Sequence, residues 1–185
     1  MQALTIEDNF RNWETDKLLK TNEWLPRAEM AVSYVKPGEQ VLDLGCGYQL
    51  PKQFLDTSCN YVPCDVVART EDTIIADLNK REFPTGNFDT TLILGVLEYI
   101  PDINFVFEKL AKQSRKVVFS YCVANIQTPE ALSVRTTNRW LTHWNSKDLD
   151  TTFRRHRFKL AEVKTISRWT HSTQVLGILV NSNKF

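Results

Sequence analysis

The amino-acid sequence predicts an α/β fold, a Rossmann-like, doubly wound and mostly parallel sheet of about seven strands with helices on both faces. Three observations predict it. Strand-like and helix-like segments alternate along most of the chain. The run FDTTLILG has few polar breaks, which is typical of a parallel strand covered on both faces. The last two strand-like segments, FKLAEVKTI and TQVLGILV, are joined without a helix, so we expect the final strand to be antiparallel.

The elements of the first half are read from turn residues and apolar runs. The segment from Phe10 to Val35 is expected to be helical, with Pro26 in the first turn of a helix that ends before Lys36-Pro37-Gly38. The strand QVLDLG follows and runs into a pair of glycines. The next elements are a helical stretch from about Pro51, a strand near Asn60 to Val67, and a short strand, Thr73 to Ile75.

The second half continues the alternation after FDTTLILG. Residues 102–114 have apolar residues at the spacing of an amphipathic helix, and KVVFSY is the fifth strand. A further helix is expected to begin at Ser146, which is a good N-cap residue, before the two final strands.

Length and charge limit the function classes. A chain of 185 residues fits one domain, which we divide into an N-terminal helical cap, 1–36, and a core, 37–185. A net charge of +1 gives no broad positive field for nucleic acid, and the only dense basic run, 154–157, suits a solvated helix end. The apolar runs are strand-length, and the start MQALTIEDNF does not resemble a signal peptide. We therefore expect a cytoplasmic protein without membrane or nucleic-acid partners. Its oligomeric state stays open.

The four cysteines are Cys46, Cys59, Cys64 and Cys122. None forms a CxxC pair, and none stands near a histidine at zinc-like spacing. We therefore interpret them as reduced thiols, and the sequence predicts no metal site.

The stretch VLDLGCG is the most informative part of the chain. Gly45 and Gly47 follow a strand directly, and glycines there let backbone come close to a ligand. Asp43 places a carboxylate beside the same crevice, at the carboxyl ends of the strands. Asp65 ends the second strand, the position at which an acidic side chain typically binds ribose hydroxyls, and Asp77 follows the third.

The chain resembles the class I S-adenosylmethionine-dependent methyltransferases over essentially its whole length. The residues that carry the resemblance are VLDLGCG, Asp65 in YVPCDVV, ADLNKREFP and FDTTLILGVLEYIPD. The resemblance implies that the turn Gly45-Cys46-Gly47 contacts the methionine part of the cofactor. It also implies that Asp65 holds the ribose, that Asp77 and Leu78 contact the adenine, and that Gly95 approaches the cofactor near the acceptor.

The sequence departs from the family at Gln49, where the family usually has a third glycine. Two alternatives are therefore kept. One is a non-catalytic module that binds S-adenosylmethionine or a nucleoside. The other is a nicotinamide-dependent oxidoreductase, which would usually have GxGxxG where this chain has GCGYQL.

The sequence says less about the methyl acceptor, because methyl transfer depends more on positioning than on catalytic residues that all such enzymes share. His143 is our preferred base, with an ordinary surface or hydrogen-bonded role as the alternative; Glu98 and Tyr99 are further candidates, or helix-start residues. The segments with Trp13, Trp24, Trp140 and Trp144 are the ones most able to cover the site, although packing is favoured for Trp24. The compact chain and the motif LGVLEYIPD favour a small-molecule acceptor, methylated at oxygen or nitrogen.

Overall fold

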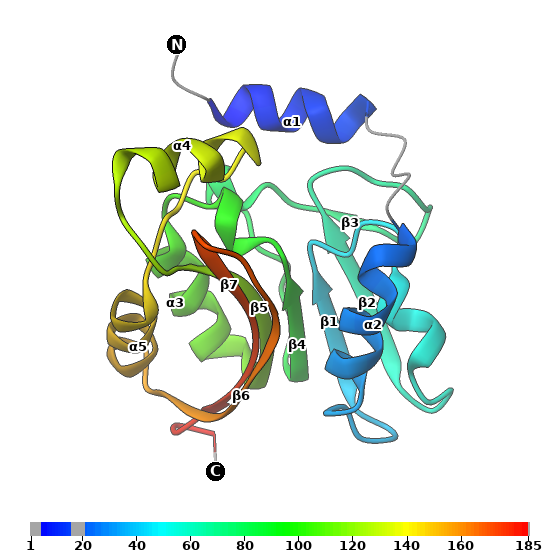
Figure 1. Cartoon of the computed structure of the whole chain (residues 1–185). Helices are drawn as coiled ribbons and strands as arrows, with labels where there is room; N and C mark the ends of the chain where they lie inside the picture. The colour runs from blue at the N-terminus through cyan, green and yellow to red at the C-terminus, as the bar shows by residue number, and fades with distance from the viewer. Residues whose placement is uncertain (1–4, 16–20, 185) are drawn as a thin grey trace.

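The computed structural model describes residues 5–15 and 21–184, and Figure 1 shows their arrangement. The helices are α1 (Ile6–Thr15), α2 (Thr21–Val32), α3 (Ile103–Gln113), α4 (Pro129–Thr137) and α5 (Ser146–Arg155), with three 3₁₀ turns, η1 (Leu50–Phe54), η2 (Leu78–Lys80) and η3 (Leu97–Tyr99). The strands are β1 (Gln40–Leu44), β2 (Asn60–Asp65), β3 (Ile74–Ile75), β4 (Phe88–Leu94), β5 (Ser114–Ala124), β6 (Phe158–Arg168) and β7 (Ser172–Asn181).

The strands form one seven-stranded sheet in the order β3-β2-β1-β4-β5-β7-β6. The first five strands pair in parallel, and β7 lies between β5 and β6 and is antiparallel to both. The predicted fold class is therefore confirmed, including the antiparallel last strand. The carboxyl ends of the parallel strands all point toward α1 and α4 (Figure 1).

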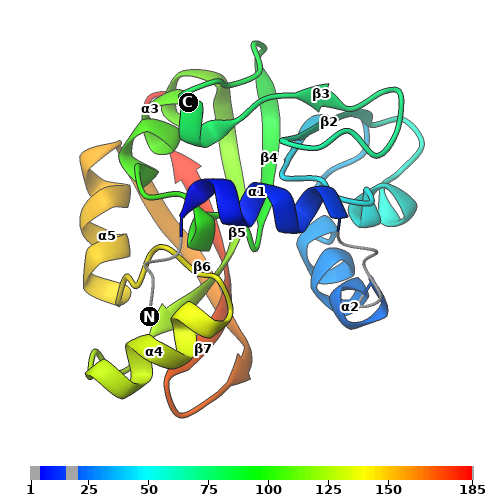
Figure 2. The same ribbon diagram turned by 90° about the horizontal axis from the view of Figure 1, so that it is seen from above.

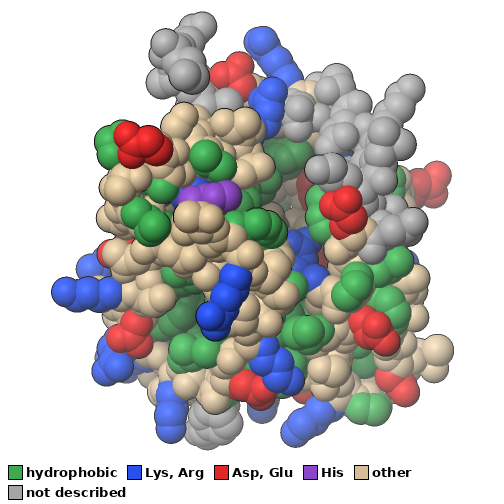
Figure 3. All heavy atoms as spheres, in the orientation of Figure 1, with side chains coloured by type: hydrophobic (Ala, Val, Ile, Leu, Met, Phe, Trp, Pro, Cys, Tyr) green, Lys and Arg blue, Asp and Glu red, His purple; other side chains and the backbone are tan. Residues whose placement is uncertain are grey.

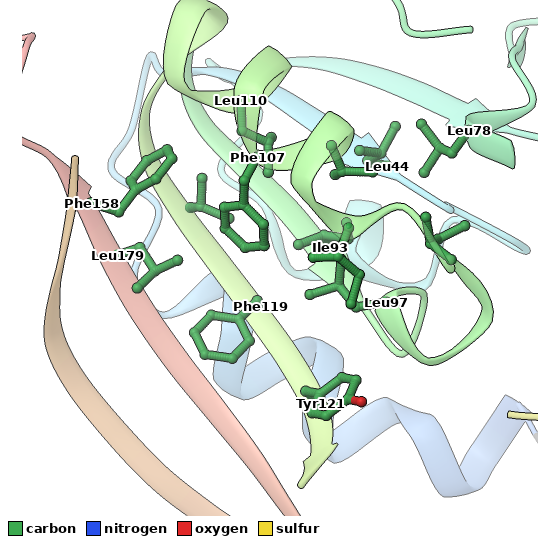
Figure 4. Packing of buried hydrophobic residues seen from close by; sticks show 14 of the residues in the cluster. Leu44, Leu78, Ile93, Leu97, Phe107, Leu110, Phe119, Tyr121, Phe158 and Leu179 are labelled. Atoms are coloured by element: carbon green, nitrogen blue, oxygen red, sulfur yellow. The ribbon is translucent and has the colours of Figure 1, made fainter. Parts of the chain in front are cut away.

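The larger core lies between one face of the sheet and helices α3 and α5. Its centre is a group of aromatic rings in which Phe107 lies 5.3 Å from Phe153 and 5.8 Å from Phe158, measured between ring centroids. Phe119 of β5 packs on the same group, and Figure 4 shows these side chains between strand and helix. Burial of this apolar surface is the main stabilising term for the domain.

The opposite face of the sheet has a smaller core. Ala31 and Val32 of α2 pack against Val41, Leu92 and Val118 of the sheet, and η1 contributes Phe54 from its periphery. Helix α2 and the short η1 contact each other on this face. The edge strand β6 is exposed along most of its length, so the elements on this face do not cover the sheet as far as that edge.

Several sequence-based boundaries need correction. The segment from Phe10 to Val35 contains two helices instead of one, with residues 16–20 outside the described ranges. Pro26 lies inside α2 and not in its first turn, so the helix lacks the hydrogen bond that an N–H at this position would donate. The stretch from Pro51 forms only a 3₁₀ turn.

Two further features of the second half differ from expectation. Asn145, and not Ser146, caps α5, since its side chain accepts hydrogen bonds from the backbone of Lys147 and Asp148. Helix α4 was missed, although Thr128 caps it and Pro129 occupies its first turn. Among the described residues, no helix has the length and apolar character needed to span a membrane.

Gly177 in the middle of β7 shows how tightly the sheet packs. A Cβ atom built there would lie 2.4 Å from a ring carbon of Phe119. We predict that Gly177→Ala destabilises the protein by about 1–3 kcal/mol, because the methyl group overfills the core. Chemical denaturation measures this loss. The double variant with Phe119→Leu should recover part of it, and a Gly177→Ala protein as stable as the parent would contradict the packing argument.

Candidate functional site

One cavity of about 410 Å³ opens at the carboxyl ends of the parallel strands. Helix α1 crosses above these ends in the view from the top (Figure 2), and Figure 3 shows the molecular surface hollowed below it. The volume is in the range of small-molecule and cofactor sites. The strand ends that line it come from β1, β2, β3 and β4, so the sequence-predicted cofactor residues converge on one space.

The glycine turn after β1 is held in a fixed shape. The N–H groups of Gly45 and Cys46 donate to the carbonyl of Cys64 at 2.7 and 3.0 Å. Gly45 has a φ of +80°, and a Cβ there would lie 2.2 Å from a methyl group of Val96. Only glycine therefore fits between β1 and the turn after β4. Cys46 is buried and lines the cavity, and burial raises the pKa of its thiol, so it stays protonated.

Asp65 joins the glycine turn to the end of β2. One of its carboxylate oxygens accepts from the N–H of Gly47 at 2.8 Å, and the other accepts from Val67 at 3.1 Å. Arg69 lies 3.7 Å from the same carboxylate. The side chain lines the cavity, and each oxygen can accept a further hydrogen bond from a ligand.

Asp77 and Leu78 line the cavity at the end of β3. The Asp77 side chain accepts from the N–H of Asn79 at 2.9 Å and caps the short turn η2, which fixes its position. Leu78 is buried and belongs to the larger core, so it anchors this wall of the cavity.

Asp43 is the most buried of the predicted acidic residues, with 2% of its surface exposed. Its carboxylate accepts a hydrogen bond from the Tyr61 hydroxyl and borders the cavity. Burial raises the pKa of Asp43 to about 7, and nearby Asp65 adds to this effect. The group is therefore poised to become charged when a cation is placed beside it.

Gln49 does not fill the cavity. It adopts a left-handed φ of +56°, a conformation that favours glycine, and its side chain points to the loop after β2. Its amide nitrogen donates to Thr70 and, at 2.9 Å, to Asp72. The departure at this position thus changes how the turn is anchored, and leaves the space at Gly47 open.

Arg27 of α2 is a cavity residue that the sequence analysis missed. Its guanidinium packs against the turn at Gly95, where a Cβ would lie 2.8 Å from a guanidinium nitrogen. It also lies 5.8 Å from the ring centre of Trp24. Within the described ranges no carboxylate pairs with it, and its Nε is buried without a partner. The carboxylates of Glu98 and Asp43 act on the guanidinium only from beyond ion-pair distance, so its donors remain available for an anion.

Glu98 and Tyr99, two of the predicted catalytic candidates, line the same cavity. Glu98 is 2% exposed, and one of its oxygens accepts from the N–H of Cys122 at 2.8 Å. Its other oxygen is buried without a partner, and burial raises the pKa of the carboxyl. Glu98 thus links the ends of β4 and β5. Tyr99 packs edge to face on Trp13 of α1, with ring centroids 4.9 Å apart.

His143 is not brought to the cavity, which corrects our preference for it as a base. Its Nδ1 accepts a hydrogen bond from Nε of Arg135 at 3.2 Å. Arg135 is fully buried and also donates to Ser172 at 2.7 Å. Burial and this guanidinium lower the pKa of His143, so the neutral ring serves as a structural acceptor. The hydrogen-bonded alternative therefore describes it.

Helix α1 is fastened across the cavity at both ends. Asn9 donates to the carbonyl of Arg139 at 3.0 Å, and Arg139 donates to the carbonyl of Asp8 at 3.1 Å. At the other end, Arg69 donates to the carbonyl of Trp13 at 2.9 Å. The helix thus limits the access of water to the space below it.

The buried carboxylate of Asp43 generates a stability prediction. Its pKa is higher in the folded state than the ordinary value of 3.8, so keeping it charged costs stability above pH 7, and the cost disappears near pH 4. We predict that Asp43→Asn is more stable than the parent at pH 8, by at most about 4 kcal/mol, and equally stable near pH 4. Thermal denaturation at both pH values measures the difference. A constant difference across this range would contradict the assignment.

The fold is shared with solved structures of methyltransferases. No protein family model and no curated protein matches the sequence. The geranyl diphosphate C-methyltransferase from Streptomyces coelicolor A3(2) has a TM-score of 0.74 at 8% identity, covering 97% of this chain and 100% of that one.

Two further solved structures show the same fold. The magnesium protoporphyrin IX methyltransferase from Synechocystis PCC 6803, solved with bound SAH, has a TM-score of 0.65 at 16% identity, covering 95% and 94% of the two chains. The [4+2]-cyclase SpnF has a TM-score of 0.69 at 10% identity, covering 91% and 85%. The chain therefore has the fold of the class I methyltransferases.

Proposed function

We propose that the protein binds S-adenosylmethionine and transfers its methyl group to a small-molecule acceptor. The observation that carries this proposal is the convergence of Asp77, Asp65, the Gly45–Gly47 turn and Gly95 on one cavity, from four adjacent strand ends. Their order along the sheet is the order of adenine, ribose and methionine in the cofactor.

The side chains fit the polar groups of the cofactor in that order. The Asp65 carboxylate would accept hydrogen bonds from ribose hydroxyls, and Asp77 with Leu78 would border the adenine. The glycine turn leaves room for the methionine portion at Gly47, where a Cβ would meet no atom within 4 Å. Asp43, with its pKa of about 7, would ionise beside the positively charged end.

Arg27 is proposed as the residue that binds the carboxylate of the methionine portion. It stands against Gly95, at the end of the series opposite to Asp77, and is unpaired within the described part of the chain. Pairing with a carboxylate would offset the cost of holding its charge in a largely buried place, which lowers its pKa.

Methyl transfer requires little covalent chemistry from the protein. S-adenosylmethionine supplies, when bound, a methyl group already activated on a positively charged sulfur. The protein must hold the acceptor in line and exclude competing water. The wall formed by Glu98 and Tyr99 would hold the acceptor, and helix α1, which crosses the cavity, would exclude water.

The fold alone does not require methyl transfer, since SpnF is a cyclase. A non-catalytic role or a different reaction on the same cofactor therefore stands as the second candidate. Solved neighbours include methyltransferases named for geranyl diphosphate and for magnesium protoporphyrin IX, and both of these are small molecules. They support the small-molecule class without identifying the acceptor of this chain.

The first test is cofactor binding. We predict that Asp65→Ala weakens the binding of S-adenosylhomocysteine by about tenfold or more, because a charged hydrogen-bond acceptor is lost. Isothermal titration calorimetry measures the dissociation constant. Asp150→Ala, an exposed acidic residue on α5, is the control and should bind like the parent. A parent protein that does not bind the ligand would overturn the proposed function.

The second test separates the parts of the cofactor. We predict that Arg27→Met weakens S-adenosylhomocysteine by about ten- to a hundredfold, because a charge-assisted contact with its carboxylate is lost. The affinity for 5′-methylthioadenosine, which lacks the amino-acid portion, should not change. Arg154→Met is the matched control on the exposed face of α5. An equal loss for both ligands would contradict the carboxylate assignment.

A further inference from the structure

The tryptophans of the chain are gathered at the cavity. The sequence contains five, and Trp13, Trp24, Trp140 and Trp169 line it. They come from four separate places, namely α1, α2, the loop before α5 and the turn between β6 and β7. Trp144 is the exception, because it packs on the larger core.

Two of these indoles, Trp140 and Trp169, belong to the acceptor side of the cavity. The cofactor residues occupy the ends of β3, β2, β1 and β4. Beyond β4 the lining includes Glu98, Cys122 and Gln174 from the β4–β5–β7 side, together with Trp140 and Trp169. Trp169 stacks on His171, with ring centroids 6.4 Å apart, and still has 46% of its surface exposed, although indole surface is usually covered. Broad flat walls with free surface suit a flat ligand, since indoles stack on planar rings.

Charge decides between a planar ring and an ammonium ion, the two ligands that aromatic walls bind best. Arg135 already lies 4.8 Å from the ring centre of Trp140, and Arg27 lies 5.8 Å from that of Trp24. A guanidinium on one face of an indole is attracted by the negative charge of the π system. A second cation on the other face would be attracted less strongly, because it would share that charge and be repelled by the guanidinium. These two rings are therefore less suited to a cationic ligand.

Glu98 is the one acidic residue on the acceptor side among the described lining residues. One of its oxygens accepts from the backbone of Cys122, and burial raises the pKa of the carboxyl, which favours its neutral form and weakens its pairing with an ammonium ion. The remaining acidic lining residues, Asp43, Asp65 and Asp77, are on the cofactor side. A cationic acceptor would also be repelled by the positively charged sulfur of the cofactor.

From these observations we propose that the methyl acceptor is a planar aromatic molecule that is neutral or anionic, stacked on Trp140 and Trp169. This proposal rests on the proposed function and narrows its substrate class. In the transfer, a lone pair on the acceptor forms the new bond to the methyl carbon. The carbon–sulfur bond breaks and leaves its electron pair on sulfur, and a proton on the acceptor atom, where there is one, passes to water.

The test uses three probes on the protein saturated with S-adenosylhomocysteine. They are 2-naphthoate (planar and anionic), decalin-2-carboxylate (anionic but not planar) and 2-naphthylmethylammonium (planar but cationic). Calorimetry should show 2-naphthoate binding at least about tenfold more tightly than either of the others. Tighter binding of the decalin or of the ammonium probe, or binding of none of them, would overturn the proposal.

Variants tie the preference to the indoles. Trp140→Leu and Trp169→Leu should each weaken 2-naphthoate by about tenfold, a typical loss for one stacking partner. Both should keep the parent's affinity for S-adenosylhomocysteine. Trp144→Leu is the matched control and should leave both affinities unchanged, provided that it is folded by circular dichroism. An equal loss in the control would contradict the assignment.

Failure of this inference can be told from failure of the proposed function. If the parent does not bind S-adenosylhomocysteine, the proposed function fails, and the three probes are then compared on the protein without it. If the cofactor analogue binds and the planar probe has no preference, only the acceptor class fails.

Discussion

The site depends on the reversal of strand order between β1 and β4. From β1 the chain continues through η1 on the face of α2, whereas from β4 it continues through α3 on the opposite face. The two connections leave the carboxyl ends of these neighbouring strands uncovered, and this is where α/β sheets bind ligands. The close contact between Gly45 and Val96 shows how little backbone bulk separates the two turns. The glycine turn after β1 and Gly95 after β4 are placed by this topological feature.

The fold and the cofactor side could be predicted because both follow from local sequence. Apolar runs fix the strands, and residues at strand ends such as Asp65 and Asp77 are carried to the same edge by the parallel pairing. Arg27 could not be found in this way. It reaches the cavity from a helix through a long side chain, and helical spacing does not say which sheet edge a side chain faces. The available signal in the sequence was that Arg27 stands about one helical turn after Trp24.

The acceptor side was hardest to predict, because its residues come from loops. His143 follows the fifth strand, which suggested a position at the cavity. Instead, its ring accepts a hydrogen bond from the buried Arg135. Trp169 stands in a short turn between two strands, and only the pairing of β7 beside β5 brings that turn to the carboxyl edge. The position of both residues depends on tertiary contacts that no local pattern encodes.

The incomplete pairing of charges at the crevice gives a physical reason to expect a ligand there. Asp43, Arg27 and Glu98 are largely buried, and each is only partly matched by its surroundings. A protein does not gain stability by keeping such groups charged and apart, since desolvation costs more than distant attraction returns. The two packed cores on either side of the sheet offset that cost. A ligand that carries a cation toward Asp43 and a carboxylate toward Arg27 would remove it. The partly unpaired groups Asp43 and Arg27 therefore match a ligand that has a zwitterionic amino-acid end.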